Sequence, residues 1–198
     1  MRMQLLCLTI FVLLGACQQD EPQKPAAVDG NWTLDDARRF TEFDLYWLGE
    51  QYEGLAFATI FQYDWDDSVH FAYGEVGRDE SGDWFAPLSV SIQPYCTETK
   101  ERLGAFLEQF ADVFGPAEDV EIRGAQGWLL DDGIGDSQML YLWPGDLTIG
   151  IRIRDHNPPA LEVGRDLFRL ADQRATGSKA FPPAEALVCP PPEDILGL

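Results

Sequence analysis

The residues that could do chemistry in this chain begin with two acidic stretches, each beside residues that favour turns. These stretches are 64–67 and 131–136. Calcium binds six to eight oxygen ligands at about 2.4 Å, and acidic loops that contain glycine can supply several of them. Neither stretch has the spacing of an EF-hand loop. Solvated β-turns are the leading interpretation, and the alternative is a weak calcium site on Asp64, Asp66, Asp67, Asp131, Asp132 and Asp136.

The histidines and serines match no motif of a known catalytic site. His70 and His156 are the only histidines, and neither lies in the spacing of a conventional zinc site. The sequence contains no Gly-x-Ser-x-Gly elbow and no glycine-rich phosphate loop. A triad around His70, or a glycosidase-like pair of aspartates, would have to assemble in space. We therefore predict a protein that is not an enzyme and needs no cofactor, with a hydrolase that has a spatially assembled acidic site as the alternative.

Two arginines stand out because the chain is strongly acidic. Arg152 and Arg154 alternate with apolar residues in 147–154 and are expected to face outward from a strand. Pairing with surface carboxylates would contribute under about 1 kcal/mol for each arginine. The functional alternative is a small patch, shared with Thr148, that binds an anion or docks a partner.

The N-terminus has the pattern of a signal peptide. Arg2 is followed by the apolar segment 5–14, which is too short to span about 30 Å of hydrocarbon as a helix. The segment ends in Leu14-Gly15-Ala16-Cys17, which resembles the lipobox of bacterial lipoproteins. That resemblance implies cleavage after residue 16 and a diacylglyceryl group on the thiol of Cys17. Two or three acyl chains, such as palmitate, would hold the protein on the outer face of the cytoplasmic membrane or on the outer membrane.

The remaining cysteines follow from this compartment. Cys7 leaves with the signal peptide and Cys17 carries lipid, so Cys96 and Cys189 remain in the folded part. In an oxidising compartment two such cysteines predict one disulfide bond. A free catalytic thiol is the alternative.

Charge and length limit the partners and the organisation. The chain has 34 acidic and 14 basic residues, a formal net charge of −20, which disfavours binding to nucleic acid and to anionic lipid headgroups. Residues 17–28 are polar with two prolines and are expected to form the lipidated N-terminus and a tether. Residues 29–198 are long enough for a single globular domain, with a proline-rich C-terminal tail.

Hydrophobic periodicity predicts strands and helices in two successive groups. A short helix is expected after Thr33, and Leu55, Phe57, Thr59 and Phe61 are expected to share one face of a strand. The first group has strands at 44–48, 55–65, 69–75 and 88–93 and a helix at 98–114. The second group has strands at 120–123, 126–130, 138–143 and 147–154 and a helix at 160–174.

The two groups predict an α+β fold. The expected architecture is a twisted, mainly antiparallel sheet in two similar strand-rich halves, each followed by an amphipathic helix. Residues 46–49, 53–55 and 92–96 look like those of a family of uncharacterised actinobacterial-type secreted proteins and lipoproteins, which has no established activity to carry over.

The expected function is that of a membrane-anchored envelope lipoprotein acting as a non-enzymatic binding or accessory module. The anchor supplies the membrane contact, and the recognised partner is an envelope protein or an apolar ligand. The aromatic residues between positions 40 and 84 are numerous. Most are expected in the core, and the alternative is that some line an apolar groove.

Overall fold

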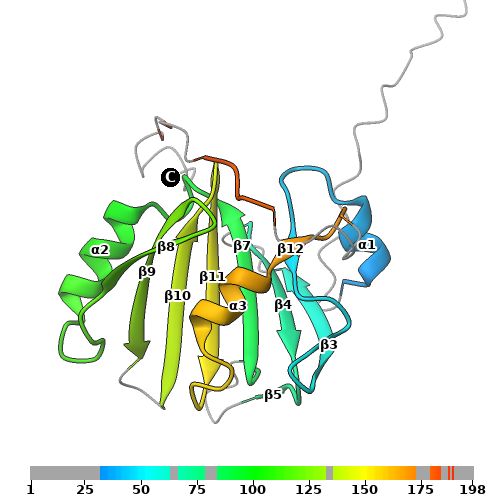
Figure 1. Ribbon diagram of the computed structural model, residues 1–198, viewed down its shortest axis with the longest axis horizontal. Coiled ribbons are helices and arrows are strands. Elements are labelled where there is room, and N and C mark those ends of the chain that lie inside the picture. Colours follow the sequence, from blue (N-terminus) through cyan, green and yellow to red (C-terminus); the bar gives the residue numbers. More distant parts are fainter. Residues whose placement is uncertain are drawn as a thin grey trace, which may run out of the picture.

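One antiparallel sheet of eight strands carries the structure. The computed structural model describes residues 32–62, 67–78, 84–132, 136–172, 179–183, 187 and 189. The strands of this sheet are β2 (Gln51–Tyr52), β3 (Leu55–Gln62), β4 (Val69–Tyr73), β7 (Leu88–Pro94), β8 (Glu118–Ile122), β9 (Ala125–Asp132), β10 (Ser137–Trp143) and β11 (Leu147–Arg154). Their spatial order is β2-β3-β4-β7-β11-β10-β9-β8, and every neighbouring pair is antiparallel (Figure 1).

The sheet consists of two four-stranded halves, and the sequence order of the strands runs in opposite directions across the two halves. The first four strands end at helix α2 (Lys100–Gln109), and the last four end at helix α3 (Ala160–Asp166). The final strands of the two halves, β7 and β11, pair with each other, and the central residue of β7, Ser91, lies opposite Gly150. The predicted α+β fold with a mainly antiparallel sheet is therefore confirmed.

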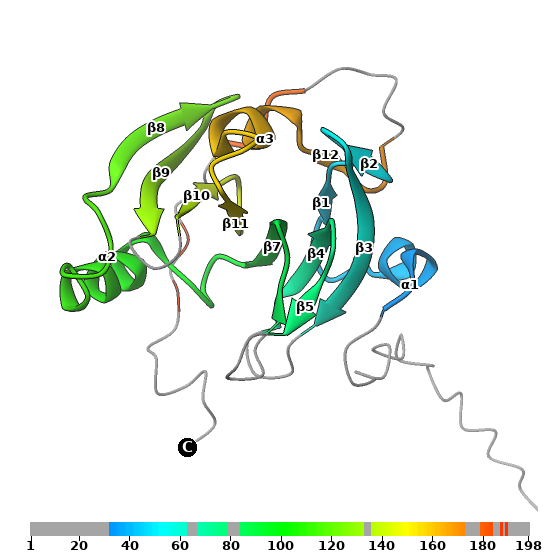
Figure 2. The ribbon, with the colours of Figure 1, turned by 90° about the horizontal axis from the view of Figure 1, so that it is seen from below.

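Alternation along the two central strands builds the hydrophobic core on one face of the sheet. Helix α3 packs closely on this face, because a Cβ added at Gly164 would lie 2.8 Å from Leu140 and 2.9 Å from Ile122. Two short strands, β1 (Tyr46–Trp47) and β12 (Phe168–Arg169), pair with each other and cover the same face beside α3 (Figure 2). The buried apolar side chains of the two central strands are Leu88, Val90, Ile92, Leu147, Ile149, Ile151 and Ile153.

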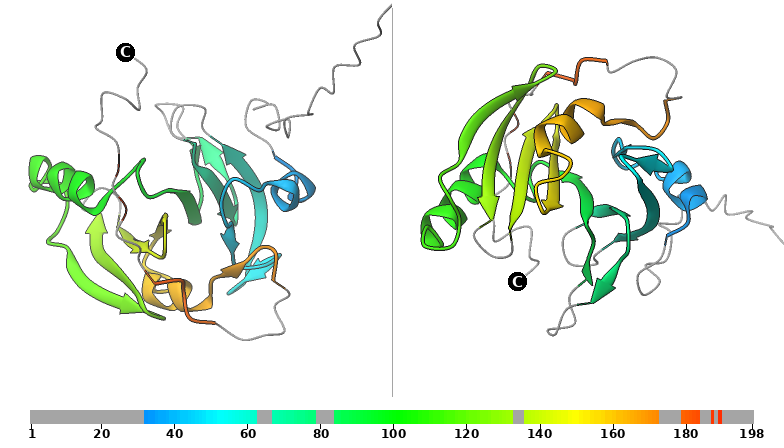
Figure 3. Two further views of the ribbon diagram at one scale, coloured as in Figure 1. Left: turned by 90° about the horizontal axis from the view of Figure 1, so that it is seen from above. Right: turned by 60° about the horizontal axis from the view of Figure 1, so that its bottom comes forward.

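A short helix, α1 (Leu34–Arg39), begins at Thr33 as predicted. The hydroxyl of Thr33 accepts a hydrogen bond from the amide of Asp36, and the Asp36 carboxylate accepts one from the amide of Thr33. The hydroxyl and the amide of Thr33 both donate to the Asp36 carboxylate, and these two hydrogen bonds lower the pKa of Asp36 to about 2. Trp32 bridges to Ile60 of β3, so α1 lies at the opposite end of the sheet from α2 (Figure 3).

Helix α2 covers part of the second face of the sheet. Gly104 faces the ring of Trp128, and a Cβ added at Gly104 would lie 3.4 Å from that ring. The Lys100 ammonium lies 4.8 Å from the centre of the same ring. The predicted helix at 98–114 is too long, since α2 ends at Gln109. Its predicted apolar stripe is also only partly buried, because Phe106 and Phe110 are 45% and 39% exposed.

The predicted helix at 160–174 is also too long. Helix α3 ends at Asp166, and the following residues form β12. Carbonyl oxygens at the end of a helix lack donors within the helix. Here the guanidinium of Arg123 donates to the carbonyl oxygens of Arg165 and Leu167. Pairing with β1 thus replaces the last helical turns.

A bulge in β3 overturns the predicted faces of that strand. Phe57 lies opposite Tyr73, whereas Thr59 lies opposite Ala72, so one extra residue sits between them. Phe57 consequently packs in the core against Tyr73, while Phe61 lies on the opposite face of the sheet. The prediction that Phe57 and Phe61 share a face is wrong, because the bulge reverses the alternation.

The predicted disulfide bond between Cys96 and Cys189 is present. Their Cα atoms lie 5.2 Å apart, and 93 positions separate them in sequence. Arg102 of α2 donates to the carbonyl oxygens of Cys96 and Thr97, so the bond joins the start of this helix to residue 189.

Removing this disulfide should lower the free energy of unfolding by about 4–5 kcal/mol, the value expected for a closed loop of roughly this length. The measurement is urea unfolding of the double variant Cys96→Ser, Cys189→Ser. Fully reduced wild-type protein is the control and should lose a similar amount. A loss below about 1 kcal/mol in both would contradict the expectation.

Candidate functional site

A pocket of about 230 Å³ lies on the face of the sheet opposite α3, which we call the open face. The pocket spans β3, β4, β7, β11 and β10, and the segment around β6 (Trp84–Phe85) borders it. A small two-stranded sheet of β5 (Gly77–Arg78) and β6 stands beside it. The residues that line the pocket are Phe61, His70, Val76, Phe85, Ala86, Ser89, Ser91, Met139, Tyr141, Gly150, Ile151, Arg152 and Arg154.

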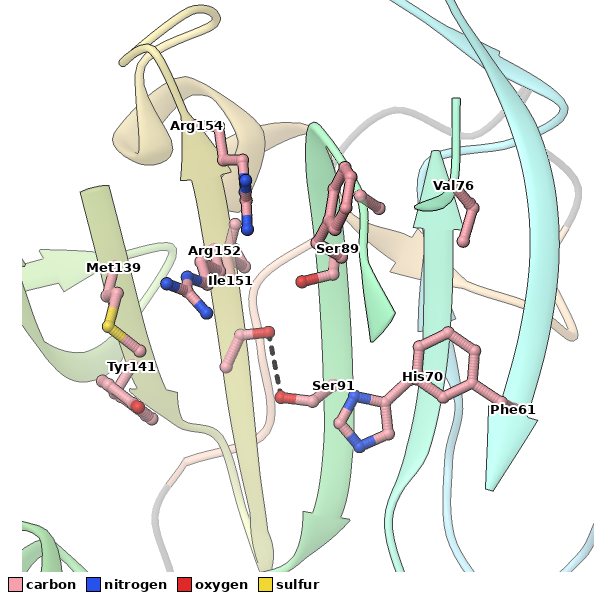
Figure 4. A pocket seen from close by; sticks show the side chains of 13 residues that line it. Phe61, His70, Val76, Ser89, Ser91, Met139, Tyr141, Ile151, Arg152 and Arg154 are labelled. Atoms are coloured by element: carbon pink, nitrogen blue, oxygen red, sulfur yellow. Dashed lines mark hydrogen bonds between the residues drawn. The ribbon is translucent and has the colours of Figure 1, made fainter. Parts of the chain in front are cut away.

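The floor of the pocket is a row of cross-strand neighbours. Phe61 lies opposite His70, His70 opposite Ser91, Ser91 opposite Gly150, and Gly150 opposite Tyr141. An added Cβ at Gly150, in the middle of this row, would lie 2.5 Å from the Ser91 hydroxyl oxygen, so a side chain there would force that hydroxyl to turn away. That hydroxyl donates to the carbonyl oxygen of Gly150 at 3.3 Å (Figure 4). The row therefore leaves a hollow above Ser91 and Gly150, between the aromatic side chains of Phe61 and Tyr141 at its two ends.

Arg152 and Arg154 project from β11 over this floor, as the alternation along the strand predicts (Figure 4). The guanidinium carbon of Arg154 lies 4.5 Å from the centre of the Phe85 ring, which holds it at the edge of the pocket. Although the chain has 34 acidic residues, none of the described residues that line the pocket is acidic. Among the described lining residues, the permanently charged side chains are therefore those of Arg152 and Arg154.

Thr148 does not belong to this patch. It is 1% exposed, and its hydroxyl donates to the carbonyl oxygen of Glu98 at 2.7 Å. The prediction that Thr148 shares a surface with Arg152 and Arg154 is wrong, because the segment that leads into α2 covers this part of β11. Thr148 instead fixes the entrance to the helix.

His70 contributes a neutral imidazole ring to the floor of the pocket. Its ring stacks on Phe61, with 5.1 Å between centres and 10° between planes. Burial lowers the pKa of His70 to about 4. Ser68 lies 2.6 Å from the Nε2 atom of His70, but its side chain is 1% exposed and does not line the pocket. The pair therefore presents no serine hydroxyl to a substrate in this pocket.

The described side chains of the acidic stretches, those of Asp67, Asp131 and Asp136, are exposed and do not line the pocket. His156 lies 3.3 Å from the carboxylate of Asp136 and 3.9 Å from that of Asp131. Asp67 is exposed, Asp132 is described by its backbone alone, and Asp64 and Asp66 lie outside the described residues. Within the described ranges, no group of three or more His, Cys, Asp or Glu side chains is arranged to hold a metal ion.

A second hollow, of about 280 Å³, lies between α1 and the end of β12. Arg38 and Arg169 line it; the guanidinium of Arg169 is paired with the carboxylate of Asp44, and that of Arg38 with the carboxylate of Asp35. The open-face pocket is the better candidate for a binding site, because its lining combines guanidinium, hydroxyl and aromatic groups from several strands.

Comparison of the chain with protein-family models, with curated proteins and with solved structures finds no match. The resemblances noted for the sequence therefore stay predictions. Cys17 and the tether at 17–28 lie outside the described residues. None of the helices in the described part of the chain is long and apolar enough to cross a membrane.

The sequence predicted some of the residues that line this pocket. It predicted the outward direction of Arg152 and Arg154 and a strand at 88–93, which is β7. It did not predict that Phe61, His70 and Tyr141 would join them, because these residues come from three other strands. Period-two alternation on β10 was the available signal for Tyr141.

Lowering the pH should destabilise the protein through His70. Below about pH 6.5 the unfolded chain binds a proton at this residue, while the folded chain stays neutral down to a pKa of about 4. Stability is therefore lost as the pH falls through this window, by about 2 kcal/mol between pH 7.5 and pH 5. Urea unfolding at both pH values should show a smaller loss for His70→Gln than for wild type.

The matched control for this experiment is His156→Gln, which removes the other histidine and leaves His70 in place. An equal pH dependence in wild type and His70→Gln would show that His70 does not contribute.

Proposed function

We propose that this protein is a membrane-anchored envelope lipoprotein whose folded domain is a non-enzymatic module that binds a ligand on its open face. The observation that carries the binding role is the open-face pocket, where two arginines meet aromatic side chains in a strongly acidic chain. The anchor is inferred from the lipobox-like residues that end in Cys17.

The disulfide bond supports the proposed location. Disulfide bonds persist in oxidising compartments such as the cell envelope and are rare in the cytosol. Cys96 and Cys189 form such a bond. An envelope protein held by acyl chains also needs no membrane-spanning helix, because two or three acyl chains are sufficient for stable attachment.

The chemistry of the pocket supports binding rather than catalysis. Among its described lining residues, the ionisable side chains are two arginines, Tyr141 and the neutral His70. A general acid or base works best with a pKa near the working pH, whereas burial moves the pKa of His70 to about 4. Arginine and a neutral imidazole are instead well suited to hold a ligand by hydrogen bonds.

Replacement of Cys17 by serine should abolish lipid attachment. In a bacterial host fed radioactive palmitate, wild-type protein should be labelled and found in the membrane fraction. The Cys17→Ser variant should be unlabelled and absent from that fraction, because serine lacks the thiol that is acylated. Cys7→Ser is the matched control and should behave like wild type. Labelling and membrane retention of Cys17→Ser would refute the anchor.

Filling the pocket should abolish ligand binding without unfolding the domain. In a thermal-shift screen of anionic, neutral and cationic small molecules, ligands that raise the melting temperature of wild type should leave Ser89→Trp unchanged. The reason is that a bulky ring at Ser89 occupies the hollow. Gln126→Trp, at an exposed position of β9, is the control and should respond like wild type. The binding role fails if no ligand shifts wild type, or if both variants respond equally.

A further inference from the structure

We propose that residues 190–198, which lie outside the described residues, dock on an aromatic stripe that begins on helix α2 and is formed by Phe106, Phe110 and Phe114. The inference concerns a surface other than the open-face pocket and does not depend on the ligand-binding role. It follows from the exposure of the stripe, from the position of the disulfide bond and from the sequence of the segment.

The aromatic stripe is an exposed apolar surface. Its phenylalanines follow one another at four-residue intervals, and residues four apart lie on the same side of a helix. The amides of Phe110 and Phe114 donate to the carbonyl oxygens of Phe106 and Phe110, so the helical spacing continues past Gln109. The centre of the Phe106 ring lies 4.8 Å from that of Phe110 and 5.6 Å from that of Phe114. Among the described residues, Phe106 and Phe110 are nevertheless the most exposed large hydrophobic side chains.

The disulfide bond places the start of the segment beside the stripe. Cys189, which directly precedes residue 190, is bonded to Cys96. Arg102 donates to the carbonyl oxygen of Cys96 at 3.1 Å. Arg102 is also four residues before Phe106 and therefore lies on the same side of α2. The chain thus leaves Cys189 on the side of the helix that carries the stripe.

The length of the segment matches the distance to the stripe. Residues 190–192 are three prolines, which favour an extended chain. Ile195 is six positions after Cys189 and can therefore reach about 19 Å from it, at about 3.1 Å per residue. Phe110 lies eight positions beyond Arg102, which is about 12 Å along a helix, and the length of the Arg102 side chain adds to this distance. The apolar part of the segment thus comes level with the stripe.

The order of side chains in the segment fits the order along the helix. Two carboxylates, Glu193 and Asp194, come first, on the side of Arg102. The apolar residues follow them, where the helix presents its phenylalanines, and removing apolar side chains from water is favourable. These apolar residues are Ile195, Leu196 and Leu198.

The tether favours this segment over an occupant from outside. A group attached by a short linker beside its site has an effective concentration in the millimolar range, so a weak apolar contact is sufficient. A second copy of the chain would bring a formal net charge of −20 against the same charge, and an anionic lipid surface would be repelled likewise.

Crosslinking between two introduced cysteines tests the contact. Gly197→Cys keeps the apolar residues of the segment. In the stripe pair it is combined with Gln109→Cys, three residues after Phe106 and on the side of the stripe. In the control pair it is combined with Glu108→Cys, two residues after Phe106 and therefore facing away from it. Both helix positions are exposed, so the two pairs are matched.

The full chain also carries Cys7→Ser and Cys17→Ser, so that a short bismaleimide reacts with the introduced thiols while the bond between Cys96 and Cys189 stays intact. The yield of intrachain crosslink is measured by mass spectrometry. It should be at least about fivefold higher in the stripe pair than in the control pair, because docking raises the local concentration of one thiol near the other.

Replacement of the apolar residues should release the segment. The triple change Ile195→Ser, Leu196→Ser, Leu198→Ser should lower the yield of the stripe pair to that of the control pair, because the contact with the rings is lost. Leu187→Ser removes an exposed leucine on the other side of Cys189 and should leave the yield unchanged. Unchanged melting temperatures of these variants would show that the fold is intact.

Three outcomes would overturn the inference. They are equal yields in the stripe pair and the control pair, a yield in the stripe pair that the triple change does not lower, and crosslinked dimers in place of the intrachain product. Dimers would show that a second copy occupies the stripe. None of these results bears on the open-face pocket, whose binding role is tested separately by the thermal-shift screen.

Discussion

The antiparallel pairing of β7 with β11 is the interaction on which the rest of the structure depends. It joins two four-stranded halves edge to edge, and its side chains alternate between two different environments. On one face the pairing brings isoleucines and leucines together under α3. On the other face it places Ser91 against Gly150 and so forms the centre of the pocket floor. A shift of one residue in this register would exchange the two faces and destroy both.

The absence of a side chain at Gly150 links the fold to the pocket. A Cβ at this position would displace the Ser91 hydroxyl from its hydrogen bond with the Gly150 carbonyl oxygen. Because both residues lie at the centre of the sheet, the hollow above them is bounded by longer side chains on the flanking strands β4 and β10. The mirrored order of the halves thus places His70 of β4 and Tyr141 of β10 on either side of the same hollow.

Helix ends and one strand face were the parts of the fold that local pattern predicted poorly. Periodicity continued past both helices into residues that the structure uses otherwise, because Arg123 and β1 compete for the chain after α3. In β3 the bulge reversed the alternation and moved Phe61 to the pocket. Each of these outcomes depends on partners that are distant in sequence. A periodic pattern contains no information about them.

The sequence by itself determined the α+β class, the alternation of the central strands, the disulfide bond and the outward direction of Arg152 and Arg154. These features follow from local periodicity or from the number of cysteines, and neither needs knowledge of distant neighbours. Only the tertiary structure decided that Phe61, His70, Ser91 and Tyr141 meet beside those arginines, and that Thr148 is buried away from them. The physical reason is that strand order and register, which are set by packing across the whole sheet, choose the neighbours of each side chain.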